Sequence, residues 1–140
     1  LIKRLKMGSV IIADRYVKSN QAHQGARRTG KDRMKIIEHF EKLEYGLYGL
    51  PKPDLNIFLD LPVILSAEAI KNQRRSTDIN ESSLDYQSEV RRTFRYLHRQ
   101  GPHHKNLIIS CINRTGERRS RQDIADKVWN GVEERILSKL

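Results

Sequence analysis

Residues 10 to 16 read Val-Ile-Ile-Ala-Asp-Arg-Tyr, and the polar sequence Val-Lys-Ser-Asn-Gln-Ala-His-Gln-Gly follows at residues 17 to 25. The short β-branched run is typical of a buried strand that would end at Asp14 and Arg15. Open α/β sheets bind their ligands at the carboxyl ends of such strands. A carboxylate there can hold a metal ion, and a guanidinium can bind a phosphate through two parallel hydrogen bonds. We therefore expect Asp14 and Arg15 to lie in a functional site.

The polar residues that follow favour a site over the simpler alternative, a solvated Asp-Arg ion pair in a turn. Asn20 and Gln24 are four residues apart, so on a helix both amides project from one face. Ser19 and His23 lie on the adjoining stripe of the same helix. Amide groups on one stripe suit the hydrogen-bonding edge of a base, so the segment favours nucleotide binding.

The rest of the chain alternates strands with helices. Residues 55–61 and 107–112 read as two further buried strands. Apolar residues at helical spacing predict four more helices, which carry Met34, Ile37, Phe40 and Leu43; Leu65 and Ala69; Tyr86, Val90, Phe94 and Leu97; and Ile124, Val128, Val132 and Ile136. Asp32 is expected to cap the first of these four, and Ser120 with Asp123 the last. Three strands alternating with helices predict a parallel sheet with right-handed crossovers.

Composition is that of one globular domain. The chain has 140 residues, of which 37% are hydrophobic and 31% charged, as in soluble folded proteins. It contains no run of eighteen apolar residues and no secretory signal, so we expect neither a membrane span nor export, and a cytosolic location. The lone Cys111 predicts no internal disulfide and reads as a small buried hydrophobe. The five histidines lack the spacing of a zinc site.

The net charge of +10 raises a competing hypothesis, a nucleic-acid-binding module. The paired arginines are dispersed along the sequence, at Arg27-Arg28, Arg74-Arg75, Arg91-Arg92 and Arg118-Arg119. No basic stripe interleaved with aromatic residues forms the stacking platform that such a module needs. We expect no specific nucleic-acid partner.

The first motif resembles the signature of the thymidylate kinases, which phosphorylate dTMP with ATP and magnesium. The matching residues are Asp14, Arg15, Tyr16, Ser19, Asn20, Ala22 and Gln24. His23 stands where the family usually has Tyr or Phe. The stretch from Gly49 to Pro62 resembles the family's second motif, a proline-bracketed loop that leads into a buried strand. Residues 71–83, with Arg74 and Arg75, resemble its lid, and the likeness extends over essentially all 140 residues.

The resemblance implies a P-loop kinase-type α/β fold with strand order 2-3-1-4-5. The loop Gly-x-x-x-x-Gly-Lys-Ser/Thr, which such kinases need for ATP, occurs nowhere in the chain. We therefore expect residues 1–140 to form a single, amino-terminally truncated domain without the first two strands. Its sheet would have a gap where the first strand belongs, and each buried unpaired backbone group costs about 1 to 3 kcal/mol. We expect these residues alone to be inactive, and aggregation-prone or partly unfolded.

The resemblance also implies the roles of individual residues. Asp14 would act on magnesium, Arg15 would hold the acceptor phosphate, and Arg74 and Arg75 would close over the phosphates. Substrate contacts are expected from Arg15, Tyr16, Ser19, Asn20, His23 and Gln24, with Asn20 and Gln24 at the thymine edge and His23 beside the sugar. ATP would approach Asn113, Arg114 and Gly116, whereas Asp60 is expected to be a turn or cap residue. The family also implies a homodimer.

Three alternatives stay open beside this interpretation, and the nucleic-acid-binding module discussed above is one of them. The second is a catalytically inactive, kinase-like nucleotide-binding protein, in which the glycine-rich loop has been lost. The third is a kinase for a different nucleotide or nucleoside.

Overall fold

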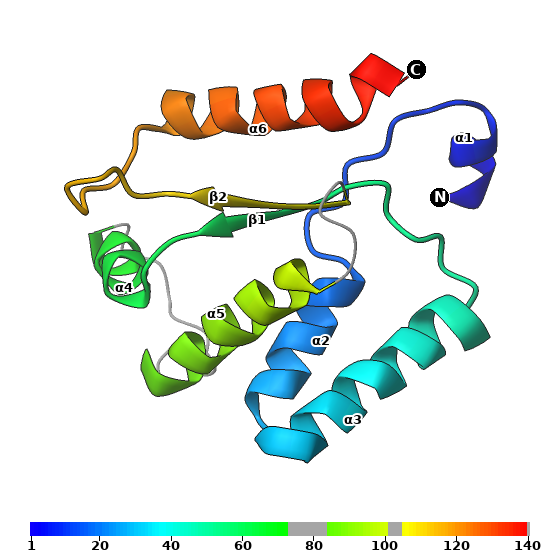
Figure 1. Ribbon diagram of the computed structural model, residues 1–140, viewed down its shortest axis with the longest axis horizontal. Helices are drawn as coiled ribbons and strands as arrows, with labels where there is room; N and C mark the ends of the chain where they lie inside the picture. The colour runs from blue at the N-terminus through cyan, green and yellow to red at the C-terminus, as the bar shows by residue number, and fades with distance from the viewer. Residues whose placement is uncertain (73–83, 101–104, 140) are drawn as a thin grey trace. The chain divides into compact units, whose positions relative to one another are not determined.

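The computed structural model describes residues 1–72, 84–100 and 105–139, which fall into two compact units, Leu1–Lys52 and Pro53–Leu140 (Figure 1). The single domain expected from the sequence stays a prediction. No helix in the described ranges is long and apolar enough to cross a bilayer.

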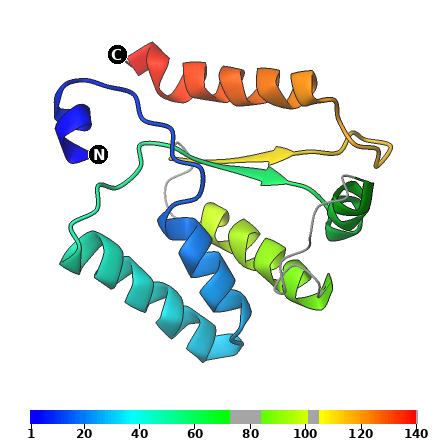
Figure 2. The same cartoon turned by 180° about the vertical axis from the view of Figure 1, so that it is seen from behind.

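The first unit is built from helices: α1 (Ile2–Lys6), α2 (Val17–Ala26), α3 (Gly30–Glu41) and the π-helix η1 (Lys42–Leu47). Helices α2 and α3 pack side by side, as Figures 1 and 2 show. The residues buried on these two helices are mostly small or branched: Val17, Gln21, Ala22, Gly25, Ala26 and Ile37. The Gln21 amide donates to the Ile37 carbonyl oxygen at 3.1 Å, which satisfies a polar side chain inside this contact.

The start of α3 differs from the prediction. The residue at the N-cap is Thr29, in an extended conformation, and Asp32 lies in the first turn instead. An acidic residue in the first turn is still stabilised by the positive end of the helix dipole, so its presence does not identify the cap. The expected cap at Asp32 was wrong by one turn.

The run at residues 10–14 is not a strand, contrary to the sequence prediction. It is irregular, and Ile12 is 93% exposed. A strand is stable only when a neighbour pairs with its backbone N–H and C=O groups. Nothing in the described ranges pairs with this run, so its β-branched residues have no sheet to join.

The second unit contains a two-stranded parallel sheet of β1 (Asn56–Asp60) and β2 (Asn106–Ser110). The strands pair in register from Asn56 opposite Asn106 to Asp60 opposite Ser110. This pairing confirms the prediction that the second and third expected strands are parallel neighbours. The second unit thus has a small parallel sheet with flanking helices, as expected for part of a P-loop kinase-type α/β fold.

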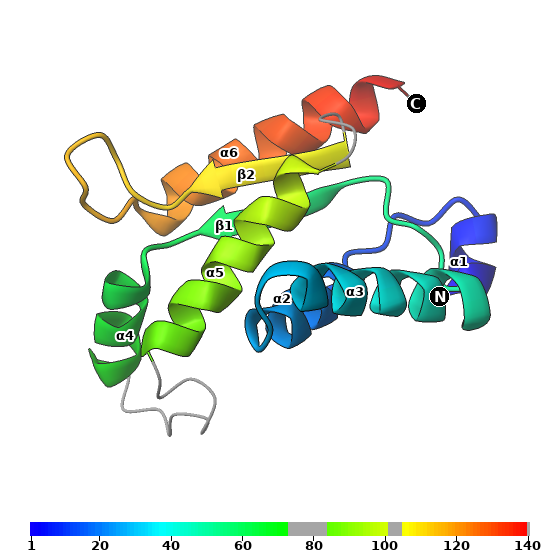
Figure 3. The ribbon, with the colours of Figure 1, turned by 60° about the horizontal axis from the view of Figure 1, so that its bottom comes forward.

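Helices cover both faces of this sheet. Helix α5 (Leu84–Arg99) lies on one face and α6 (Arg121–Arg135) on the other, as Figures 1 and 3 show. The Phe58 and Phe94 rings stack at 5.0 Å between centroids on the α5 face. On the α6 face, Gly131 is buried so closely against Leu107 that an added β-carbon would overlap the leucine side chain.

The remaining elements of this unit are α4 (Val63–Asn72), which contacts α5, and the short 3-10 helix η3 (Leu137–Lys139). Helix α6 begins as predicted: the Ser120 hydroxyl oxygen accepts a hydrogen bond from the Asp123 amide at 3.0 Å. Cys111 is buried as predicted, and burial raises the pKa of its thiol. The thiol therefore stays protonated, and unreactive, at neutral pH.

Candidate functional site

Asp14 and Arg15 lie on an exposed, irregular segment that leads into α2. Arg15 has a backbone φ of 65°, in the left-handed region, which costs a residue with a side chain about 1 to 2 kcal/mol. Strain of this kind is concentrated at functional sites. Both charged groups are open to solvent just before the helix, where a phosphate and a metal ion can reach them.

The other residues expected to bind substrate lie at the start of α2 and along it. Ser19, Asn20, His23 and Gln24 are all half-buried on this helix, so the structure confirms that they share one element. Tyr16 is the N-cap residue, and its hydroxyl donates to the Pro51 carbonyl oxygen at 3.0 Å. This bond joins the start of α2 to the proline-rich loop, two segments that are 35 residues apart in the sequence.

Glu44 is a member of this site that the sequence did not reveal. It is buried in the π-helix η1, and its Oε1 accepts a hydrogen bond from Asn20 Nδ2 at 2.6 Å. Single π-helical turns are rare and occur frequently at functional sites. Burial, followed by the charges of Tyr16, Glu41 and Glu44, raises the pKa of the neighbouring Tyr45 to about 12. In the sequence Glu44 reads as an ordinary carboxylate on a helix. The structure shows that its position on that helix is buried.

Lys18 is a half-buried basic residue of this unit. Burial lowers the pKa of its ammonium to about 8, although Glu41 partly opposes the shift. Because an unfolded lysine titrates near 10.4, the unfolded state binds more protons between about pH 8 and pH 10. The contribution of Lys18 to stability therefore increases as pH rises through this window.

We predict that the Lys18 side chain titrates with a midpoint near pH 8. The measurement is an NMR titration of the lysine Cε resonances, in which a Lys18→Met variant identifies the Lys18 signal by its absence. A midpoint above pH 10 would show that the ammonium is solvated.

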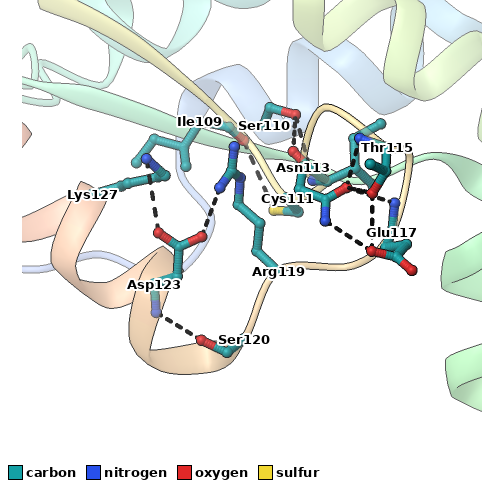
Figure 4. Close-up of polar contacts among 11 residues, drawn as sticks. Ile109, Ser110, Cys111, Asn113, Thr115, Glu117, Arg119, Ser120, Asp123 and Lys127 are labelled. Carbon is teal, nitrogen blue, oxygen red and sulfur yellow. Dashed lines mark hydrogen bonds and ion pairs between the residues drawn. The ribbon is translucent and has the colours of Figure 1, made fainter.

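In the second unit, the loop after β2 is held by its own side chains (Figure 4). Asn113 Oδ1 accepts from the backbone amides of Thr115 and Glu117 at 3.0 and 2.9 Å. Asn113 Nδ2 donates to Glu117 Oε2 at 3.0 Å. Gly116 has a φ of 86°, so the turn needs glycine there. Of the three residues expected near ATP, Asn113 and Gly116 shape the loop, and Arg114 projects from it into solvent.

Replacement of Asn113 by alanine is expected to loosen this loop. It removes the acceptor of two backbone amides, at a cost of about 1 kcal/mol for a solvent-exposed turn. Hydrogen exchange of the Thr115 and Glu117 amides should accelerate at least several-fold. The matched control is Arg114→Ala in the same loop, which should leave both rates unchanged. Equal exchange in the two variants would contradict the role given to Asn113.

Asp60, which we expected to be a turn or cap residue, has a different role. It is 7% exposed at the end of β1, and its carboxylate pairs with Arg91 at 2.5 Å and Arg95 at 3.6 Å. The ion pairs tie the carboxyl end of the strand to α5. The prediction of a turn or cap residue was wrong because pairing across two elements leaves no local sequence signal.

A groove of about 870 Å³ lies beside this pair, lined in part by α5. Its basic residues are Arg91, Arg92, Arg95 and Arg99. Asp60 pairs with two of them, and Glu89 pairs with Arg92 at 2.6 Å. Two carboxylates against four guanidiniums leave the groove cationic.

The chain matches the family model described as thymidylate kinase over residues 1–119. The chain belongs to the thymidylate kinase family. The match includes the Asp14-Arg15 segment, all of α2, the proline-rich loop, both strands and the loop after β2. It confirms the family that the motifs predicted.

Curated thymidylate kinases show the same likeness. The protein from Rhodopseudomonas palustris is 27% identical over 136 residues, which cover 95% of this chain and 54% of the relative. The one from Limosilactobacillus fermentum is 36% identical over 101 residues, 70% of this chain and 44% of the relative. The one from Thermosynechococcus vestitus is 32% identical over 98 residues. The chain thus spans about half the length of the Rhodopseudomonas palustris relative.

Two other predicted features of a thymidylate kinase are the lid and the magnesium site. The lid expected at residues 71–83, with Arg74 and Arg75, lies almost wholly outside the described residues. In the described ranges, no three His, Cys, Asp or Glu side chains gather as a metal cluster. Magnesium in kinases is typically held by one or two carboxylates together with water and substrate phosphates. A single exposed carboxylate such as Asp14 fits that kind of site.

Proposed function

We propose that the protein is a thymidylate kinase, which transfers the γ-phosphoryl group of ATP to dTMP and yields dTDP for dTTP synthesis. The observation that carries the proposal is the family match over residues 1–119, which includes the whole acceptor motif. The residues of this chain would supply the dTMP-binding part and the lid. We further propose a cytosolic homodimer, as the family implies.

The charged residues before α2 would handle the phosphates. Phosphoryl transfer needs little covalent work from the protein, so positioning and charge neutralisation dominate catalysis. Arg15, exposed and next to the helix, would grip the dTMP phosphate with its forked donors. Asp14 would hold magnesium directly or through water, and the bound ion would neutralise charge on the transferring group.

The polar face of α2 would bind the nucleoside. Asn20 and Gln24 carry amides that match the donor and acceptor groups of thymine, and both are partly accessible on the helix. His23 would pack beside the deoxyribose, and Ser19 would bind close to the phosphate end. The Tyr16 hydroxyl is already used by Pro51, so Tyr16 would shape the site through its ring and its loop contact.

ATP would be bound mostly by residues outside the acceptor motif and outside α2. The loop at Asn113, Arg114 and Gly116 would approach the adenine, with Arg114 as its free cationic side chain. Arg74 and Arg75 would close over the transferring phosphate.

The test is a nucleotide-kinase assay on the full-length gene product. The protein is incubated with ATP, magnesium and, in turn, dTMP, dUMP, dCMP and dGMP. We expect dTDP as the main product and its loss when EDTA removes magnesium. Binding of dTMP without turnover would favour the inactive relative, and preference for another monophosphate would favour a different nucleotide kinase.

A further inference from the structure

We infer that Glu44 is a positioning residue that selects the base by fixing which end of the Asn20 amide faces the nucleotide. The inference rests on the proposed function, because it assumes that Asn20 meets the base. It assigns a role to a residue outside the acceptor motif.

The geometry between the two side chains carries the argument. Glu44 is 8% exposed, and its Oε1 lies 2.6 Å from Asn20 Nδ2. Glu44 is held in place by the π-helical turn, where its backbone oxygen also accepts from the Leu50 amide at 3.0 Å. The pKa of Tyr16 is raised, first by burial and then by the negative charge of Glu44. The acceptor is thus both fixed and charged.

A carboxylate can only accept hydrogen bonds, whereas an amide has a donor end and an acceptor end. Glu44 therefore requires that Asn20 turn its nitrogen inward. The opposite orientation would bring Asn20 Oδ1 against a carboxylate oxygen, with two acceptors in contact and no proton between them. In the described ranges Asn20 Oδ1 accepts no hydrogen bond, so it is left to meet a ligand.

An exposed carbonyl oxygen discriminates between pyrimidines. Thymine and uracil carry a hydrogen on N3, which can donate to Asn20 Oδ1. Cytosine has a lone pair on N3, which would be repelled by the same oxygen. A site built to bind one pattern rejects the other because its polar group is left unpaired. Glu44 would thus bias the enzyme toward dTMP and dUMP and against dCMP.

The test compares Glu44→Gln with wild type in the full-length gene product. A glutamine can accept from Asn20 or donate to it, so the amide becomes free to flip. The ratio of kcat/KM for dTMP to kcat/KM for dCMP should fall about tenfold, the difference that a charged hydrogen bond commonly makes. Glu44→Asp keeps the carboxylate and should restore part of the ratio. The matched control is Glu38→Gln, an exposed carboxylate in α3, which should leave the ratio unchanged.

A double-mutant cycle separates positioning from a general structural effect. If Glu44 acts through Asn20, then Glu44→Gln should not change the ratio further in an Asn20→Ala background. A readout without turnover is the NMR signal of the Asn20 side-chain amide, which should lose its carboxylate-bonded shift in Glu44→Gln.

Two failures are distinguishable. Wild type without activity on dTMP overturns the proposed function itself. Active wild type with an unchanged base ratio in folded Glu44→Gln overturns only the role of Glu44. If Glu44→Gln does not fold, two measurements replace it: the ratio of kcat/KM for dTMP to that for dCMP in Glu44→Asp, and the NMR signal of the Asn20 side-chain amide in wild type. If wild type shows no carboxylate-bonded Asn20 amide signal, the inference is overturned.

Discussion

Replacement of Arg15 by alanine is expected to lower kcat/KM for dTMP by at least about 100-fold, the usual cost of removing a charged donor from a phosphoryl-transfer site. Arg15 is exposed and held with a φ of 65° just before α2. Its forked guanidinium would bind the acceptor phosphate and keep it in line with ATP. The measurement is steady-state dTDP formation by the full-length gene product.

A glycine at the same position separates catalysis from folding. Glycine adopts positive φ without strain, so Arg15→Gly should leave the unfolding temperature unchanged or higher. Activity should nevertheless be lost. Arg15→Lys keeps the charge but not the forked pair of donors, so its activity should lie between those of wild type and Arg15→Ala. The control is Arg4→Ala, which removes an exposed arginine of α1 and should be fully active. Unchanged catalytic efficiency in Arg15→Ala would remove the main site assignment.

The second large effect concerns stability. Asp60→Ala is expected to reduce the free energy of unfolding by about 2 kcal/mol, because Arg91 and Arg95 lose the buried carboxylate that pairs with them. The value lies below that of a fully buried pair because both arginines are partly exposed to solvent. Urea denaturation of the full-length protein measures the change.

Asp54→Ala is the matched control for this experiment, since Asp54 is an exposed aspartate six positions earlier in the same unit. It should change the free energy of unfolding by less than about 0.5 kcal/mol. If the two alanine variants have the same stability, the Asp60 ion pairs do not hold the strand end to α5.

Local patterns predicted most of the secondary structure. Helical spacing of Val90, Phe94 and Leu97 predicted α5, and the residue types of Ser120 and Asp123 predicted the start of α6. Such signals depend on a few neighbouring residues, and those residues are all present in the chain. The motif that identified the family is local in the same way.

Features that depend on a distant partner could not be predicted. The run at residues 10–14 has strand-forming residues but lacks a pairing neighbour in the described ranges, and it stays irregular. The Asn20 bond to Glu44 spans 24 residues, and the Asp60 bond to Arg91 spans 31. Glu44 lies outside both motifs, and Asp60 lies in the second motif, but no local pattern names the partner of either carboxylate, because another element brings that partner close.

The central claim is that the segment from Asp14 to Gln24 binds dTMP, and a titration of the ¹⁵N-labelled full-length protein with dTMP tests it most directly. We predict saturable shifts of the Arg15, Asn20 and Gln24 signals, which Arg15→Ala should weaken strongly. If saturating dTMP leaves these signals unchanged while the protein is folded, the segment is not the acceptor site.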